Sequence, residues 1–94
     1  MDDLRSRAAA LLAGSYPLTR GMNLTGLIRR YVASEPWNDP ELRNQLSLCL
    51  QTAQTEAARF EGAMEGPARD ARTFYQRAAA ILQDIKAEVA AGRV

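Results

Sequence analysis

Apolar residues recur at helical spacing along two neighbouring stretches of the chain, residues 40–65 and 67–91. In the first stretch they follow steps of three and four residues, at Leu42, Leu46, Cys49, Ala53, Ala57, Phe60 and Met64. In the second stretch they lie at Ala71, Phe74, Tyr75, Ala78, Ile81, Leu82, Ile85 and Val89. A spacing close to 3.6 residues places such positions on one side of a helix. The pattern therefore predicts two long amphipathic helices.

Local signals indicate where these two helices begin and end. Asp39, Pro40 and Glu41 form a typical start, with a capping residue, a proline at the first helical position and an acid in the first turn. The predicted junction, Glu65-Gly66-Pro67, is so short that the second helix must run antiparallel to the first. The apolar positions of the first helix also repeat every 11 residues, a period that keeps them in line without a left-handed supercoil.

Two shorter helices are predicted before this hairpin, over about residues 3–13 and 24–33. The first has one apolar side, formed by Leu4, Ala8, Leu11 and Leu12. The second has a core-facing side at Leu24, Leu27, Ile28, Tyr31 and Val32, and Asn23 is its predicted cap. Gly26 disfavours that helix by up to about 1 kcal/mol relative to alanine, and a close contact with another helix is one explanation for it.

No stretch shows the strict alternation of apolar and polar residues that predicts a β-strand. We therefore predict an all-α fold, a small four-helix bundle in which two shorter N-terminal helices pack on a long antiparallel C-terminal helical hairpin. Ninety-four residues form one domain, residues 1–94, with helices at about 3–13, 24–33, 40–65 and 67–91.

The predicted core is thin, because 17 residues are alanine while leucine, isoleucine, valine and phenylalanine together number 19. An alanine side chain buries much less apolar area than a leucine, and buried apolar area sets the hydrophobic free energy. Either the helices approach closely through their alanine faces, or a second chain completes the core. We favour the second chain, which predicts a homodimer.

The residue types of common catalytic sites are missing. The chain has no histidine and a single cysteine, which excludes zinc sites built from these residues and catalytic Ser–His or Cys–His pairs. The acid pairs Glu61/Glu65 and Asp84/Glu88 are interpreted as solvated charges rather than metal ligands. We predict no enzymatic activity, no metal site, no cofactor and no small-molecule substrate.

Cys49 lies on the apolar side of the first long helix, where we interpret it as a small buried side chain rather than a reactive thiol. One cysteine cannot form an internal disulfide, which favours a reducing compartment. No apolar run approaches the ~20 residues of a membrane span, and Ala8–Ala13 is too short for a signal peptide. These features predict a cytoplasmic protein with no membrane partner.

The middle of the first long helix carries no charged residue from Asn44 to Thr55. Exposed helix surfaces usually carry Lys, Glu and Arg, whereas the cores of protein interfaces are depleted in Lys, Glu and Asp. One explanation is that a second chain covers this side of the helix. The other is that this helix is the central helix of its own bundle. We prefer the second chain and predict that Ser47, Leu48, Gln51 and Thr55 contact a partner.

Two aromatic residues and two arginines complete the set of candidate partner-binding residues. Tyr16 and Trp37 lie in loops beside prolines, where they either anchor an interface or cap the open ends of the bundle. Arg29 and Arg30 lie on the polar side of the second helix.

These features predict a non-enzymatic protein–protein interaction module: a small accessory, regulatory or inhibitory subunit that binds a larger protein partner and forms a homodimer. The alternative is a nucleic-acid-associated helical protein that uses Arg29, Arg30, Arg69, Arg72 and Arg77. A net charge of +1 argues against this alternative, and high arginine and alanine usage is also what a GC-rich genome produces. The ten-residue connection between the first two helices is too long for a helix-turn-helix motif.

Overall fold

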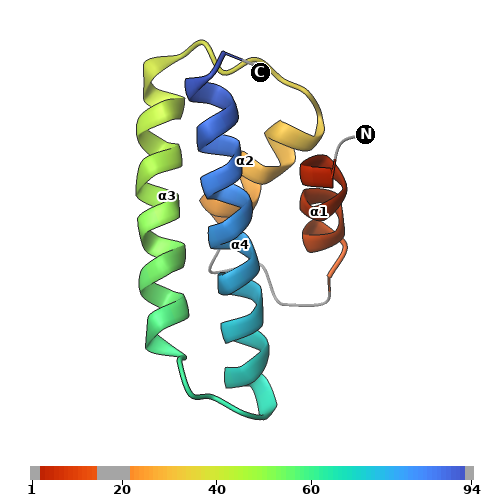
Figure 1. Cartoon of the computed structure of the whole chain (residues 1–94), viewed down its shortest axis with the longest axis vertical. Coiled ribbons are helices and arrows are strands. Elements are labelled where there is room, and N and C mark those ends of the chain that lie inside the picture. The colour runs from red at the N-terminus through yellow and green to blue at the C-terminus, as the bar shows by residue number, and fades with distance from the viewer. Residues whose placement is uncertain (1–2, 15–21, 93–94) are drawn as a thin grey trace.

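The computed structural model describes residues 3–14 and 22–92, and in these ranges it has four α-helices and no strand (Figure 1). The helices are α1 (Asp3–Leu12), α2 (Met22–Val32), α3 (Pro40–Arg59) and α4 (Gly66–Ala90). The all-α fold and the C-terminal helical hairpin are confirmed. Because α2 begins at Met22, Asn23 lies inside the helix instead of capping it.

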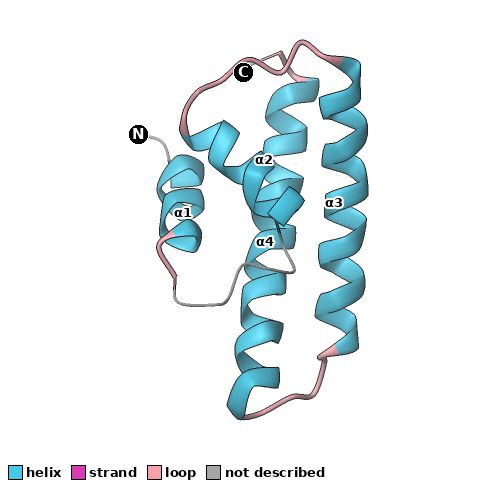
Figure 2. Cartoon of the chain, turned by 180° about the vertical axis from the view of Figure 1, so that it is seen from behind, coloured by secondary structure: helices cyan, strands magenta, loops and turns pink. Residues whose placement is uncertain are grey.

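The central helix of the bundle is α4. It packs against α3 along the hairpin and also contacts α1 and α2. Helix α3 contacts α4 and α2 but not α1, and both views show α4 lying between α3 and α1 (Figures 1 and 2). The interpretation of residues 40–65 as the central helix of the bundle is therefore wrong. One side of α3 packs on α4 and α2, while the residues of its opposite side are exposed and no described helix lies against them.

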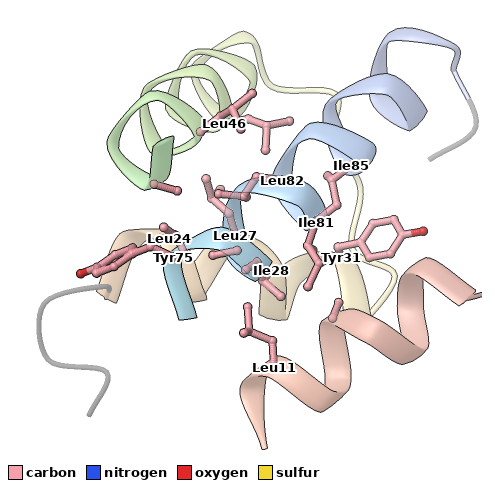
Figure 3. Packing of buried hydrophobic residues seen from close by; sticks show 14 of the residues in the cluster. Leu11, Leu24, Leu27, Ile28, Tyr31, Leu46, Tyr75, Ile81, Leu82 and Ile85 are labelled. Carbon is pink, nitrogen blue, oxygen red and sulfur yellow. The ribbon is translucent and has the colours of Figure 1, made fainter. Parts of the chain in front are cut away.

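The apolar side of α4 forms the centre of the core. All eight positions predicted from its spacing are buried: Ala71, Phe74, Tyr75, Ala78, Ile81, Leu82, Ile85 and Val89. Leu46 of α3, Ile28 of α2 and Leu11 of α1 meet this side from three directions (Figure 3). Ala8, Ala53 and Ala78 are fully buried, so the helices approach one another closely at their alanines.

The two short helices are attached to the hairpin by apolar packing and by charged side chains. Leu24, Leu27, Ile28 and Tyr31 of α2 are buried, as their spacing predicts. Arg7 of α1 forms an ion pair of 2.6 Å with Asp84 of α4, although both side chains are about half exposed. Arg5 lies over the ring of Tyr31, 5.7 Å from its centroid, in a cation–π contact. These contacts hold α1 against α2 and α4.

Helix α3 ends at Arg59, six residues before the predicted end at Glu65. Gly62 then adopts a positive φ of 89°, which glycine tolerates and which a helix cannot continue through. The connection therefore spans residues 60–65 instead of a turn at Glu65-Gly66-Pro67. Met64, the last position of the predicted apolar stripe, lies in this connection and is 75 % exposed.

Gly26 makes no close helix–helix contact. A Cβ atom built on this glycine has no neighbour within 4 Å, and the residue is exposed. The explanation of Gly26 by close packing is therefore wrong, and the structure supplies no other reason for a glycine there.

Phe74 and Phe60 should differ in their contribution to stability. Phe74 is buried edge-on against Tyr75, whereas Phe60, just after the end of α3, is half-buried and stacks on the same ring. We expect Phe74→Ala to lower the free energy of unfolding by about 3–5 kcal/mol. Phe60→Ala should lower it by about 1–2 kcal/mol, because less apolar area is lost. Urea unfolding followed by Trp37 fluorescence measures both, and a loss under ~1 kcal/mol for Phe74→Ala contradicts the packing described here.

Two glycine-to-alanine substitutions should act in opposite directions. Gly26 lies in α2 with open space around it, so Gly26→Ala should stabilise the chain by about 0.5–1 kcal/mol. Gly62 also has open space around it, but its positive φ disfavours any Cβ, so Gly62→Ala should destabilise the chain by about 1–2 kcal/mol. The same urea titration measures both changes in the free energy of unfolding. If both substitutions stabilise the chain, or both destabilise it, then either Gly26 does not lie in a helix or Gly62 does not adopt a positive φ.

Candidate interaction surface

The start of α3 determines which side of the helix faces the core. The Asp39 side chain accepts a hydrogen bond of 2.9 Å from the Glu41 backbone N–H, and Pro40 occupies the first helical turn. From this start, Leu46, Leu50 and Ala53 turn toward α4 and are buried. The sequence pattern placed Cys49 on the buried side of α3, but in the structure Leu50 is buried and Cys49 is only half-buried. The buried side of α3 is therefore rotated slightly from the predicted one.

The opposite side of α3 carries a continuous strip of exposed, uncharged side chains. This strip, called here the outward face, consists of Asn44, Gln45, Leu48, Gln51, Thr52 and Thr55, with Ser47 and Gln54 along one edge. Leu48 lies at its centre and is 62 % exposed. The chain's own helices leave this strip uncovered, so intramolecular burial does not explain its lack of charge.

Charged residues bound the outward face at both ends of α3. Glu41 is exposed in the first turn and Arg59 is exposed in the last turn. The Arg59 Nη1 atom lies 3.6 Å from Oε2 of Glu56, whose side chain is mostly buried, while 64 % of the Arg59 side chain is exposed. The strip therefore has a negative boundary near the start of the helix and a positive one near its end.

Cys49 borders the buried side of α3 and is half-buried. Burial raises the pKa of its thiol above the ordinary value by desolvating the thiolate. The thiol therefore stays protonated at neutral pH, which makes it a poor nucleophile and a poor metal ligand. This agrees with the interpretation of Cys49 as a packing residue.

Trp37 lies inside the core and is only 2 % exposed. Its ring therefore cannot anchor a partner in this structure, and the interpretation that it covers an end of the bundle fits better. Its Nε1–H has no hydrogen-bond partner among the described residues, a state that destabilises a fold by about 1–3 kcal/mol. Tyr16, the other aromatic candidate, lies outside the described residues.

Of the two candidate arginines on α2, Arg30 is held by its own chain. Its guanidinium donates a hydrogen bond of 3.2 Å to the Pro36 carbonyl and pairs with Glu35 at 3.2 Å. Ser34 adopts a positive φ of 60° where the helix ends, and the Glu35 backbone N–H bonds to the Arg30 carbonyl. Arg30 thus supports the turn after α2, whereas Arg29 is exposed.

The structure places Ser47, Leu48, Gln51 and Thr55 together on one exposed side of α3, and it separates them from Trp37. Sequence reasoning missed the boundary charges Glu41 and Arg59, although a helical-wheel count places both on the outward side.

In residues 3–14 and 22–92 no three His, Cys, Asp or Glu side chains gather as metal ligands would. None of the described helices combines the length and the apolar character needed to cross a bilayer.

Comparison with protein-family models, with curated proteins and with solved structures finds no match to this chain.

Two leucines on opposite sides of α3 provide a direct check of this surface. Leu46 is 1 % exposed and Leu48 is 62 % exposed. In the monomeric chain at low concentration, Leu46→Ala should lower the free energy of unfolding by about 2–5 kcal/mol. Leu48→Ala, Gln51→Glu and Thr55→Lys should each change it by no more than about 0.5 kcal/mol, as surface substitutions do. Similar losses for the two leucines in urea unfolding would mean that α3 is rotated from the position described.

Proposed function

We propose that this chain is a non-enzymatic protein–protein interaction module of the reducing cytoplasm, and that it binds its partner through the outward face of α3. The observation that carries the proposal is an exposed helix side, three turns long, with no charge and a leucine at its centre. A surface designed to stay solvated carries about 25–35 % charged residues, and this strip carries none. The cores of protein interfaces lack Lys, Glu and Asp because such charges must be desolvated on binding.

The same surface supports a role as a small accessory or regulatory subunit. A surface of polar amides and hydroxyls around one leucine binds by packing and hydrogen bonding, and it supplies no acid or base that could activate a hydroxyl as a nucleophile. The absence of histidine from the chain and the protonated state of Cys49 support binding without chemistry.

The alternative, contact with nucleic-acid phosphates through arginines, has weaker support. Arg30 is engaged with Glu35 and Pro36, and Arg69 lies 3.7 Å from Asp70, so two of the five candidate arginines have acids beside them. The two functions differ in their response to salt. Binding through six to ten phosphates weakens about 10³–10⁵-fold between 50 and 200 mM salt, whereas binding through an uncharged face changes little.

A photo-crosslinking amino acid placed at Gln51 tests the proposed function in the native cell. The matched control is the same amino acid at Gln83, an exposed glutamine on α4. Irradiation should attach a polypeptide at position 51 and not at position 83, and mass spectrometry identifies it. Adding Thr55→Lys should reduce the yield at position 51 at least about tenfold, because binding would bury an unpaired charge. No product at 51, or equal products at both positions, would overturn the proposal.

A further inference from the structure

Glu41 and Arg59 lie on the same side of α3. They are eighteen residues apart, which is five turns at about 3.6 residues per turn, and both are exposed. Along the axis they are about 27 Å apart at ~1.5 Å per residue. The uncharged outward face, with Leu48 near its middle, fills the space between them. The helix thus presents a neutral strip with opposite charges at its two ends.

This strip is complementary to itself when two copies lie antiparallel. A two-fold axis at the level of residue 50 places Glu41 of one copy beside Arg59 of the other, twice. The same axis places Leu48 beside Thr52 of the second copy and Asn44 close to Thr55. A parallel arrangement would instead bring the two Glu41 side chains together and the two Arg59 side chains together. Antiparallel helices also align their dipoles favourably.

We propose that the partner of the outward face is a second copy of this chain, bound antiparallel through α3 with Glu41 and Arg59 paired across both ends. This inference rests on the proposed function and adds the identity of the partner. The outward face carries no charged residue, so the second copy brings no like charge against it; Arg43 and Glu56 also lie between the boundary positions but are not part of this face. Arg59 would then lie between Glu56 of its own helix and Glu41 of the second copy.

The contact is small, which sets the expected affinity. A strip about 27 Å long and about 10–12 Å wide covers roughly 300 Å² of each copy. Stable complexes bury about 1,200–2,000 Å² in total, so this dimer belongs to the weak, reversible class. We therefore expect the dimer to dissociate at much higher concentrations than stable complexes do, and sedimentation equilibrium over a concentration series measures this.

Charge exchange at the two ends tests the pairing. Glu41→Arg and Arg59→Glu each replace two attractive pairs by two repulsive ones, so each should weaken the dimer about tenfold in 50 mM salt. The double variant Glu41→Arg/Arg59→Glu restores opposite charges and should recover most of the affinity. The double variant still carries both substitutions at the ends of α3, so any effect of these substitutions on the stability of the monomer is still present. Recovered dimer affinity therefore cannot be explained by monomer stability. Dimerisation that is insensitive to these substitutions, or a double variant weaker than both single ones, would overturn the pairing.

Disulfide cross-linking tests the direction of the helices. On a Cys49→Ala background, chains carrying Asn44→Cys and chains carrying Thr55→Cys are oxidised separately and as a mixture. The antiparallel dimer predicts a disulfide in the mixture and little in either chain alone, because residue 44 lies about 18 Å along the axis from its own symmetry mate. A parallel dimer would cross-link each chain to itself, and this result would overturn the proposal.

Failure of this inference is distinguishable from failure of the proposed function. A chain that stays monomeric up to 1 mM, at about 10.3 kDa, overturns the second copy as partner. In that case a photo-crosslink from Gln51 to a different polypeptide would still support the interaction module. A crosslinked product of twice the chain mass, lost in Glu41→Arg and recovered in the double variant, supports both.

Discussion

The fold depends on the burial of one side of α4. Eight side chains of this helix are removed from water, and no single neighbouring helix covers them all. Because α1, α2 and α3 each cover part of this side, α4 takes the centre and the other three surround it. Apolar burial is the main favourable term in a domain of this size, where the core is small relative to the surface. Loss of α4 packing would therefore remove a contact from each of the other three helices, and only the contacts of α2 with α1 and α3 would remain between them.

The central position of α4 leaves α3 on the outside. A helix at the edge of a bundle needs only one apolar side, and Leu46, Leu50 and Ala53 supply it. The opposite side is then free of any folding requirement, and charged residues there would improve solubility. Amides and hydroxyls around Leu48 lack that advantage, but they still form hydrogen bonds with water. Removing amides and hydroxyls from water also costs less free energy than removing charges, which favours a reversible contact.

The parts of the structure that follow from local spacing could be predicted from the sequence, and the parts that depend on backbone conformation could not. The eight buried positions of α4 and the start of α3 at Asp39 and Pro40 depend on periodicity and capping, which a sequence displays directly. The end of α3 depends on Gly62 adopting a positive φ, whereas Gly66 offered an equally plausible stop. For Trp37, the sequence left two roles open, an interface anchor and a cap on the end of the bundle, because its burial depends on how the chain folds back on the bundle.

The outward face, too, could be predicted from the sequence only in part. Its lack of charge is visible in the sequence, but both a central helix and an outer helix could lack charge there. The two cases are separated only by the packing of α4 against the other three helices. Ordinary helix geometry sets the register of the outward face. Leu48 follows Glu41 by seven residues and precedes Arg59 by eleven, which is close to two and three turns of an α-helix. All three residues therefore lie on one side of α3, which is what the proposed contact between two copies needs along its length.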